Sequence, residues 1–318
     1  MKKDHEQYYL GLDTSAYTTS LALVDQDEML IFDCRKPLPV KEGSLGLRQS
    51  EAIFAHLNQL PELWDPEAEI KDHAKIAAVA YSSAPRPVKN SYMPVFKVSE
   101  ALGLFLARTM GFNYLSSTHQ EAHVMAGLWS AGLNAGRYLV VHLSGGTTEI
   151  ISAEEYEPGC LKLELLGGSS DLNAGQFIDR LGKAMGFAFP AGPALEKLAK
   201  ECKNDHLELP IAVKKNQISF SGPASHAERL LHKGCHKEEL ARAIERCIAD
   251  SVINAVTNLS IDRKSFDALL AVGGVISNKF IRSRLKEKLT GWKVYFADPE
   301  YAGDNAVGLA VLAARYFR

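Results

Sequence analysis

The stretch RYLVVHLSGGTTEIISA, residues 137–153, decides the fold class of this chain. An apolar run at 137–143 is followed by a turn of small and hydroxyl residues and by a second apolar run at 149–153, which predicts two strands joined by a tight turn. The same order stands near the start, where residues 8–24 place the polar turn 13–19 between two apolar runs. A motif that occurs twice predicts two similar α/β halves that face a cleft.

Apolar periodicity outside these two turns predicts the remaining elements. Apolar residues three and four apart indicate helices, and short continuous apolar runs indicate buried strands. The predicted helices are 50–63, 95–110, 119–128, 174–185, 194–203, 224–233, 238–259, 278–289 and 304–318, and the further predicted strands are 76–81, 268–272 and 294–297. We place the domain boundary between an N-terminal lobe, 1–133, and a C-terminal lobe, 134–318, with the last helix packing back on the first lobe.

Composition excludes several classes of protein. The 36 Lys and Arg against 38 Asp and Glu give a net charge of −2, unlike that of a strongly basic nucleic-acid coat protein. The sequence holds no long apolar run for a membrane span, and residues 1–6 do not begin a signal peptide. Its five scattered cysteines form no CxxC pair, which favours reduced thiols. We therefore expect a cytoplasmic protein that does not enter a membrane.

The segment HQEAH, residues 119–123, is the strongest metal-binding signal. Two histidines four residues apart lie one turn from each other on the same face of a helix, where both imidazoles can reach one cation. Gln120 stands where a zinc protease of the HExxH pattern has its glutamate, so protease chemistry is not supported. The alternative is a helix with two partly exposed histidines. A third ligand is required, and Asp304 suits either that role or a helix cap.

Glycine turns at strand ends indicate a nucleotide site. Gly145 and Gly146 with flanking hydroxyls let a phosphate approach the backbone, although the same pattern also makes an ordinary hairpin. Further glycine-marked turns are expected at 167–168, 191–193 and 273–274. Several such turns together indicate a nucleotide cleft more strongly than any one of them does alone.

Two polar residues near these turns each have two interpretations. Asp179, on a predicted helix, suits a bond to a ribose hydroxyl or surface charge beside Arg180. Asn278 suits a helix N-cap or a contact with a base or ribose.

These segments together resemble the TsaD family, the tRNA N-threonylcarbamoyladenosine synthases once described as O-sialoglycoprotein endopeptidases and related to the KEOPS catalytic subunit. The family's HxExH motif resembles 119–123, its TDNA motif resembles 303–306, its SGG turn resembles 144–146, its GEAFDK helix resembles 175–180 and its GGVxAN segment resembles 273–278. The resemblance implies His119, His123 and Asp304 as metal ligands. It implies that the nucleotide is bound by Ser144, Gly145, Gly146, Thr147, Asp179, Gly192, Glu196 and Asn278.

The resemblance also implies a fold, an activity and partners. The fold is α/β, with two lobes of the actin, Hsp70 and sugar-kinase type and a duplicated ribonuclease-H-like core. The activity is transfer of a threonylcarbamoyl group from its adenylate to an adenosine of tRNA. The implied cofactors are one divalent metal, iron or zinc, and an adenine nucleotide, namely threonylcarbamoyl-adenylate, ATP or ADP. Implied partners are tRNA, a TsaB-like paralogue and a TsaE-like ATPase.

Departures from the family pattern lie mainly in the first half. The opening ETSCDET is DTSAYTT at 13–19, and Thr147 replaces the histidine of SGGHT. A glycine-rich stretch is replaced at 83–96, and Pro223 and Ala224 stand in place of Leu and Lys. This pattern predicts a divergent paralogue. It leaves open transfer to tRNA, carbamoyl transfer to another acceptor and a non-catalytic nucleotide-binding partner, and it assigns no catalytic residue.

Overall fold

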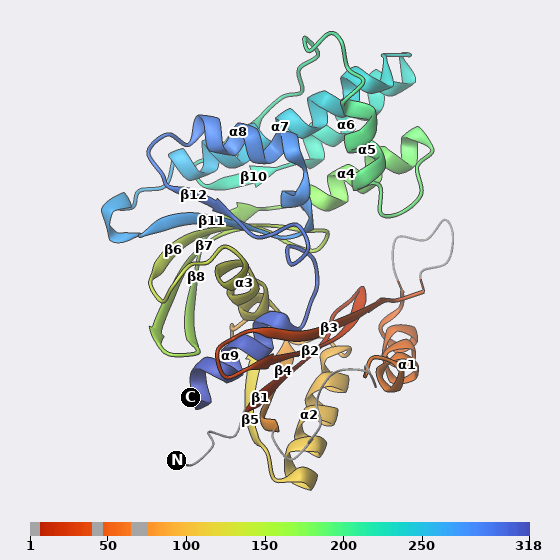
Figure 1. The fold of residues 1–318 in the computed structure, drawn as a ribbon. Coiled ribbons are helices and arrows are strands. Elements are labelled where there is room, and N and C mark those ends of the chain that lie inside the picture. The colour runs from red at the N-terminus through yellow and green to blue at the C-terminus, as the bar shows by residue number, and fades with distance from the viewer. Residues whose placement is uncertain (1–6, 40–46, 65–75) are drawn as a thin grey trace. The chain divides into compact units, whose positions relative to one another are not determined.

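The computed structural model describes residues 7–39, 47–64 and 76–318 (Figure 1). The chain divides into two compact units. The first unit comprises Met1–Ala135, Glu154–Leu163 and Gly303–Arg318, and the second comprises Gly136–Ala153 and Glu164–Ala302. Residues 1–6, for which we expected no signal peptide, lie outside the described residues.

A five-stranded sheet in the order β3-β2-β1-β4-β5 forms the centre of the first unit. Its strands are β1 (Tyr8–Thr14), β2 (Thr18–Asp25), β3 (Leu30–Pro37), β4 (Ile76–Ala84) and β5 (Asn113–Thr118). The first three strands are antiparallel, while β4 and β5 run parallel to β1. The predicted strand–turn–strand at 8–24 is therefore confirmed. The helices of this unit are α1 (Gln49–Gln59), α2 (Phe96–Met110), α3 (His119–Ser130) and α9 (Val307–Phe317), with a 3₁₀ turn at Leu60–Glu62.

Close packing of α9 brings distant segments of the first unit together. A Cβ placed on Gly11 of β1 would lie 2.7 Å from the backbone nitrogen of Ala310, so only a glycine lets helix and strand approach this closely. Gly308 does the same between α9 and α3, where a Cβ would lie 2.9 Å from the nitrogen of Ala126. These contacts place the end of β1, the first turn of α3 and the segment before α9 near one another.

A seven-stranded sheet in the order β12-β11-β6-β7-β8-β10-β9 forms the second unit, although the hairpin end of β7 and β8 belongs to the first. Its strands are β6 (Arg137–Leu143), β7 (Thr148–Glu157), β8 (Cys160–Ser169), β9 (Ala212–Lys214), β10 (Gln217–Ser219), β11 (Ala268–Val272) and β12 (Val294–Phe296). Its helices are α4 (Ala174–Met185), α5 (Gly192–Ala199), α6 (Ser221–His232), α7 (Lys237–Thr257) and α8 (Lys279–Lys288), with 3₁₀ turns at Arg263–Ser265 and Gly274–Ser277.

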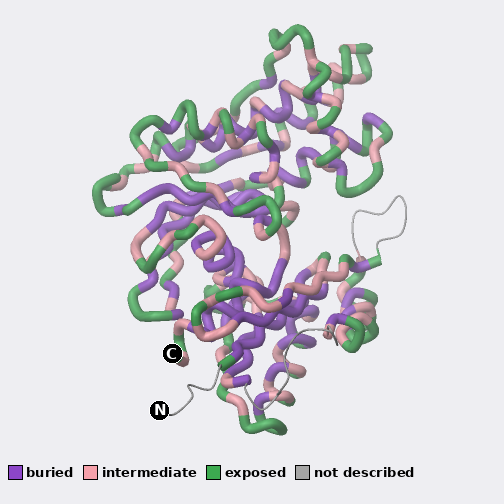
Figure 2. The backbone as a smooth tube through the Cα atoms, in the orientation of Figure 1, coloured by how far each residue is buried: buried purple, intermediate pink, exposed green. Residues whose placement is uncertain are grey.

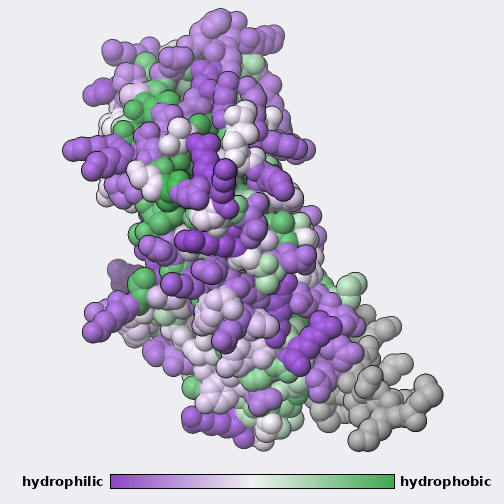
Figure 3. Space-filling model, turned by 90° about the vertical axis from the view of Figure 1, so that its left-hand side faces the viewer, coloured by the Kyte–Doolittle hydropathy of each residue, from purple (hydrophilic) through white to green (hydrophobic). Residues whose placement is uncertain are grey.

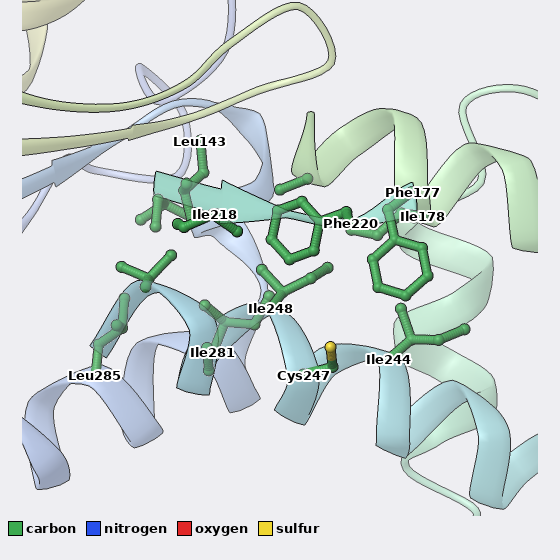
Figure 4. Packing of buried hydrophobic residues seen from close by; sticks show 14 of the residues in the cluster. Leu143, Phe177, Ile178, Ile218, Phe220, Ile244, Cys247, Ile248, Ile281 and Leu285 are labelled. Atoms are coloured by element: carbon green, nitrogen blue, oxygen red, sulfur yellow. The ribbon is translucent and has the colours of Figure 1, made fainter. Parts of the chain in front are cut away.

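Each unit has its own apolar core. In Figure 2 the buried residues lie along the strands and recur along the helices of each unit. In the second unit α7 packs against the sheet, with Ile248 beside Phe220 and Ile244 beside Phe177 (Figure 4). Hydrophilic side chains cover most of the face drawn in Figure 3. None of the helices within residues 7–39, 47–64 and 76–318 combines the length and apolar character needed to cross a bilayer.

Candidate metal and nucleotide sites

The first turn of α3 holds the two histidines of the HQEAH segment. Thr118 is the N-cap: its hydroxyl accepts a hydrogen bond from the backbone N–H of Glu121. The Glu121 carboxylate in return accepts from the backbone N–H of Thr118 at 2.9 Å, which completes a capping box. The carboxylate of Glu121 is thus used to cap the helix. His119 and His123 lie one helical turn apart.

The structure brings His119, His123 and Asp304 into one cluster, in which a ligand atom from each lies within 4.8 Å of the others. Asp304 Oδ1 is 3.2 Å from His123 Nε2 and 3.6 Å from His119 Nε2, and the two Nε2 atoms are 3.1 Å apart. The helix after Asp304 begins only at Val307, whose N–H is capped by the side chain of Asn305. The interpretation of Asp304 as a helix cap is therefore wrong.

Two residues, one near the end of β1 and one in the turn that follows, orient this cluster. Asp13 is fully buried, and its Oδ2 accepts from His119 Nδ1 at 2.9 Å, which leaves Nε2 of the same ring to face Asp304. Ser15 Oγ donates to Asp304 Oδ2 and accepts from the backbone N–H of Thr18 at 3.0 Å. The sequence predicted Asp13 and Ser15 to lie in a polar turn but did not indicate a role for either of them at the metal. The available signal was a carboxylate at the end of a fully buried strand.

The charges of the cluster reinforce one another. Burial lowers the pKa of His119, but attraction and hydrogen bonds from Asp13 and Asp304 outweigh it and hold this pKa well above its usual value. Burial likewise raises the pKa of Asp304, but His119 and His123 hold it well below the usual range. The other oxygen of Asp13, Oδ1, is buried without a hydrogen-bond partner among the described residues. A cluster this rich in negative charge fits one divalent cation, and two imidazoles with one carboxylate are ligands that iron and zinc accept.

In the second unit, the Ser144–Gly145–Gly146 turn faces the N-terminus of α4. Gly175 N–H donates to the Ser144 carbonyl at 3.1 Å, and Thr148 Oγ1 accepts from the first N–H of the helix at 2.7 Å. A Cβ on Gly145 or Gly146 would touch nothing within 4 Å, so this backbone is open. Open backbone beside a helix N-terminus is suited to a phosphate because the helix dipole favours negative charge there.

Two of the other predicted glycine segments lie next to this turn, although the prediction of a turn at 167–168 is wrong, because Gly167 and Gly168 lie within strand β8. Gly273 has φ +98°, and a Cβ there would lie 2.7 Å from the carbonyl carbon of Leu143, at the end of β6. Gly168, in β8, similarly lies against the first residues of β7: its Cβ would be 3.1 Å from Glu149 Cα. Three of the four predicted glycine segments therefore gather at one edge of the sheet.

The remaining predicted nucleotide contacts lie along α4, α5 and α8. Asp179 Oδ1 accepts from the backbone N–H of Ala191 at 2.8 Å, beside the open backbone of Gly192, and burial raises its pKa. Arg180 pairs instead with Glu228, so the interpretation of Asp179 as surface charge beside Arg180 finds no support.

Glu196 lines a pocket and contacts Lys279, the residue that follows Asn278. Glu196 Oε1 accepts from the backbone N–H of Lys279 at 3.2 Å. Asn278 is the N-cap of α8, since its Oδ1 accepts from the Ile281 N–H at 2.9 Å. The cap interpretation is thus confirmed, and a contact with a nucleotide remains a prediction. The pocket, about 270 Å³, is lined by Glu196, Lys200, Arg242, Glu245, Lys279 and Phe280.

Known proteins with related folds cover nearly the whole chain. HypF in a phosphate- and nucleotide-bound form matches 99% of this chain and 56% of its own, with 13% identity and a TM-score of 0.64. A ROK family glucokinase from Streptomyces griseus covers 96% of this chain and 99% of its own, with 13% identity and a TM-score of 0.50. These likenesses confirm the predicted α/β fold of the actin, Hsp70 and sugar-kinase type.

Sequence comparison identifies the family. The tRNA N6-adenosine threonylcarbamoyltransferase of Archaeoglobus fulgidus is 29% identical over 95% of this chain and 88% of its own length. A probable bifunctional tRNA threonylcarbamoyladenosine biosynthesis protein of Methanocaldococcus jannaschii is 27% identical, and the chain spans 54% of that longer protein. The family model TsaD, tRNA N6-adenosine threonylcarbamoyltransferase, matches residues 96–311. The chain therefore belongs to the TsaD family.

Proposed function

We propose that this protein transfers a threonylcarbamoyl group from threonylcarbamoyl-adenylate to an adenosine of tRNA, with one bound divalent metal, iron or zinc. The observation that carries the proposal is the convergence of His119, His123 and Asp304 on one point from segments 181 residues apart in sequence. Membership of the TsaD family and the names of its relatives support the choice of group and acceptor.

The chemistry asks mainly for positioning. The adenosine amine attacks the carbamoyl carbon, a C–N bond forms, the C–O bond to the adenylate phosphate breaks, and AMP and the amine proton leave. Because the mixed anhydride is already activated, orientation and stabilisation of developing charge supply most of the rate. A bound cation would act as a Lewis acid toward carbamoyl or phosphate oxygens.

Residues of each unit have a defined part in this proposal. Asp13 holds His119 with its Nε2 lone pair toward the cation, and Ser15 fixes one oxygen of Asp304 so that the other is free to ligate. In the second unit, the open backbone of Gly145 and Gly146 would receive the phosphate of the adenylate. A cytoplasmic location and a TsaB-like paralogue and TsaE-like ATPase as partners belong to the same proposal.

A second candidate function is that of a nucleotide-binding partner without transfer activity, or of a carbamoyltransferase with another acceptor. Thr147 favours it, because a hydroxyl stands where the family motif has an imidazole. Assays with threonylcarbamoyl-adenylate and either unmodified tRNA or small amine acceptors separate these cases. Tight nucleotide binding without turnover on any acceptor identifies the non-catalytic partner.

The direct test of the metal site measures bound metal in the purified protein. We expect about one equivalent of iron or zinc in the wild type and none in the double variant His119→Ala, His123→Ala. The matched control is His232→Ala, His236→Ala, since these two histidines have the same spacing but are exposed. A wild-type protein that takes up no divalent metal when titrated with it contradicts the metal site.

A further inference from the structure

A fully buried carboxylate lies beneath the pocket of the second unit. Glu245 is in the middle of α7 and has no solvent exposure. Its neighbour in sequence, Ile244, belongs to the apolar core of this unit, beside Phe177 (Figure 4). A buried carboxylate is costly unless each of its oxygens accepts a hydrogen bond or pairs with a charge. The hydrogen-bond partners of Glu245 therefore indicate its role.

Each oxygen of Glu245 has one charged or polar donor. Oε2 accepts from Arg242 Nη1 at 2.6 Å, and Oε1 accepts from the side-chain amide Nδ2 of Asn278 at 2.5 Å. Arg242 is itself held, because its Nη2 donates to the Ala199 carbonyl at 2.9 Å and its guanidinium lies over the ring of Phe280. The carboxylate therefore joins α7 to the loop in front of α8.

The contact fixes which way the Asn278 amide points. Its oxygen accepts from the Ile281 N–H as the helix cap, and its nitrogen donates to Glu245. Exchanging the two ends would set a donor against a donor and an acceptor against an acceptor, so only one orientation satisfies both partners. Lys279, the next residue, lines the pocket.

We propose that Glu245 is a positioning residue: by holding the amide of Asn278, it keeps the start of α8, with the pocket residue Lys279, in the arrangement in which the pocket binds a nucleotide. This inference rests on the proposed nucleotide site. Glu245 borders the pocket, but its side chain has no solvent exposure and both of its oxygens are paired with protein donors, so we expect it to act through Asn278.

Protonation of Glu245 would disturb the arrangement. The pKa of Glu245 is raised to about 7: burial is the largest cause and Glu196 of α5 adds to it, whereas Asn278, Arg242 of α7 and Lys200 of α5 oppose the shift. Lys279 at the start of α8 is the other charged residue of the pocket. In a protonated carboxyl, one oxygen carries a hydrogen that would face the N–H of either Arg242 or Asn278. The hydrogen bond between that donor and Glu245 would then be lost. The orientation of Asn278 is therefore secured above about pH 7 and loosened below it.

The test measures ADP binding by calorimetry between about pH 6 and pH 8.5. In the wild type, affinity should fall as the pH drops through 7. Glu245→Gln has nearly the same shape but cannot accept two hydrogen bonds from two donors without presenting its own N–H to one of them. We expect this variant to bind ADP about tenfold more weakly at pH 8 and to lose the pH dependence.

A double-mutant cycle shows whether Glu245 acts through Asn278. Asn278→Ser keeps a side-chain oxygen for the helix cap but removes the amide N–H. The double variant should bind ADP no more weakly than Asn278→Ser alone. Asp250→Asn is the matched control, because Asp250 also joins α7 to α8, through Arg284, and does not contact Asn278. Its ADP affinity and pH dependence should equal those of the wild type.

Three outcomes overturn the inference while leaving the nucleotide site intact: wild-type affinity in Glu245→Gln, additive losses in the cycle, or an equal loss in Asp250→Asn. A wild type that binds no adenine nucleotide contradicts the proposed function instead. The amide NMR signal of Asn278, assigned by its absence in Asn278→Ser, tests the contact without any nucleotide. It should titrate with a midpoint near pH 7 in the wild type, and a signal that does not move overturns the inference.

Discussion

In the first unit the candidate metal ligands are held by other side chains, whereas in the second the turn that we propose for phosphate is glycine backbone with open space beside it. Asp13 and Ser15 each contact one metal ligand, so the cluster exists only when distant segments pack together. Gly145 and Gly146 instead lie in open space beside a helix N-terminus. The first site therefore depends on the packing of its unit, and the second depends on the absence of side chains.

The largest effect should follow from a change in packing beneath the metal cluster. Gly308→Val places a side chain where even a Cβ would collide with the carbonyl of Ala122 in α3 and lie 2.9 Å from the nitrogen of Ala126. We expect the free energy of unfolding to fall by about 3 kcal/mol and metal binding to be lost with it. Chemical denaturation followed by circular dichroism measures the first quantity.

Gly303→Ala is the control for that change, because its Cβ would touch nothing within 4 Å although it lies in the same C-terminal segment. It should unfold within about 0.5 kcal/mol of the wild type. A Gly308→Val protein as stable as Gly303→Ala would show that α3 and α9 do not need close contact.

A smaller effect, confined to metal affinity, is expected from Asp13→Asn. An asparagine keeps the shape of Asp13 but removes the charge that supports His119, so affinity for zinc or iron should fall 10- to 100-fold. Competition with a chelator of known affinity measures it. Asp33→Asn is the control, since Asp33 pairs with Arg35 in the same sheet and contacts no metal ligand. Unchanged affinity in Asp13→Asn would remove Asp13 from the site.

Gly146→Val tests the contrasting region. Because a Cβ on Gly146 would touch nothing within 4 Å, a larger side chain there should leave the free energy of unfolding within about 0.5 kcal/mol of the wild type. It should nevertheless weaken ADP binding about tenfold by occupying the space that a phosphate needs. Calorimetry and denaturation on the same sample separate the two effects. A variant that binds ADP normally would place the phosphate elsewhere.

The same contrast explains how much of the molecule could be predicted from its sequence. Apolar spacing predicted α4 with its observed bounds, and the interior strands β1, β6 and β11 were also foreseen. Strands β3, β5 and β8 were missed because many of their residues are exposed or half-buried and break the apolar pattern, and β9 and β10 were missed because they are both short and partly exposed.

Sites that need only local spacing were easier to predict than sites that need distant contacts. The histidine pair follows from a single helical turn, and the glycine turns are visible in the sequence. Asp13 lies 106 residues from His119, and Glu245 lies 33 residues from Asn278. Nothing in the local sequence of either carboxylate indicates its partner, since the contact is made by tertiary packing.

The smallest predicted effect concerns the loop beside the glycine turns. Asp171 accepts hydrogen bonds from the backbone N–H of Leu172 and Phe220 and from the hydroxyl of Ser219. Although burial opposes it, these bonds lower the pKa of Asp171 to about 2. A carboxyl whose pKa is lower in the folded state adds stability above its unfolded pKa, about 4, and loses it as the pH falls toward 2. Because Asp171 is exposed, solvent screening limits this contribution to about 1 kcal/mol.

Asp171→Asn should therefore lower the free energy of unfolding by about 1 kcal/mol at pH 7, and the difference from the wild type should shrink below about pH 4. Denaturation at both pH values measures it. Glu164→Gln serves as the control, because this residue is an exposed carboxylate in the neighbouring strand β8. A difference that stays constant down to pH 2 would mean that the asparagine acts by shape. In that case the charge of Asp171 would not stabilise the loop. The position of the glycine turns in the second unit would then depend on backbone packing alone.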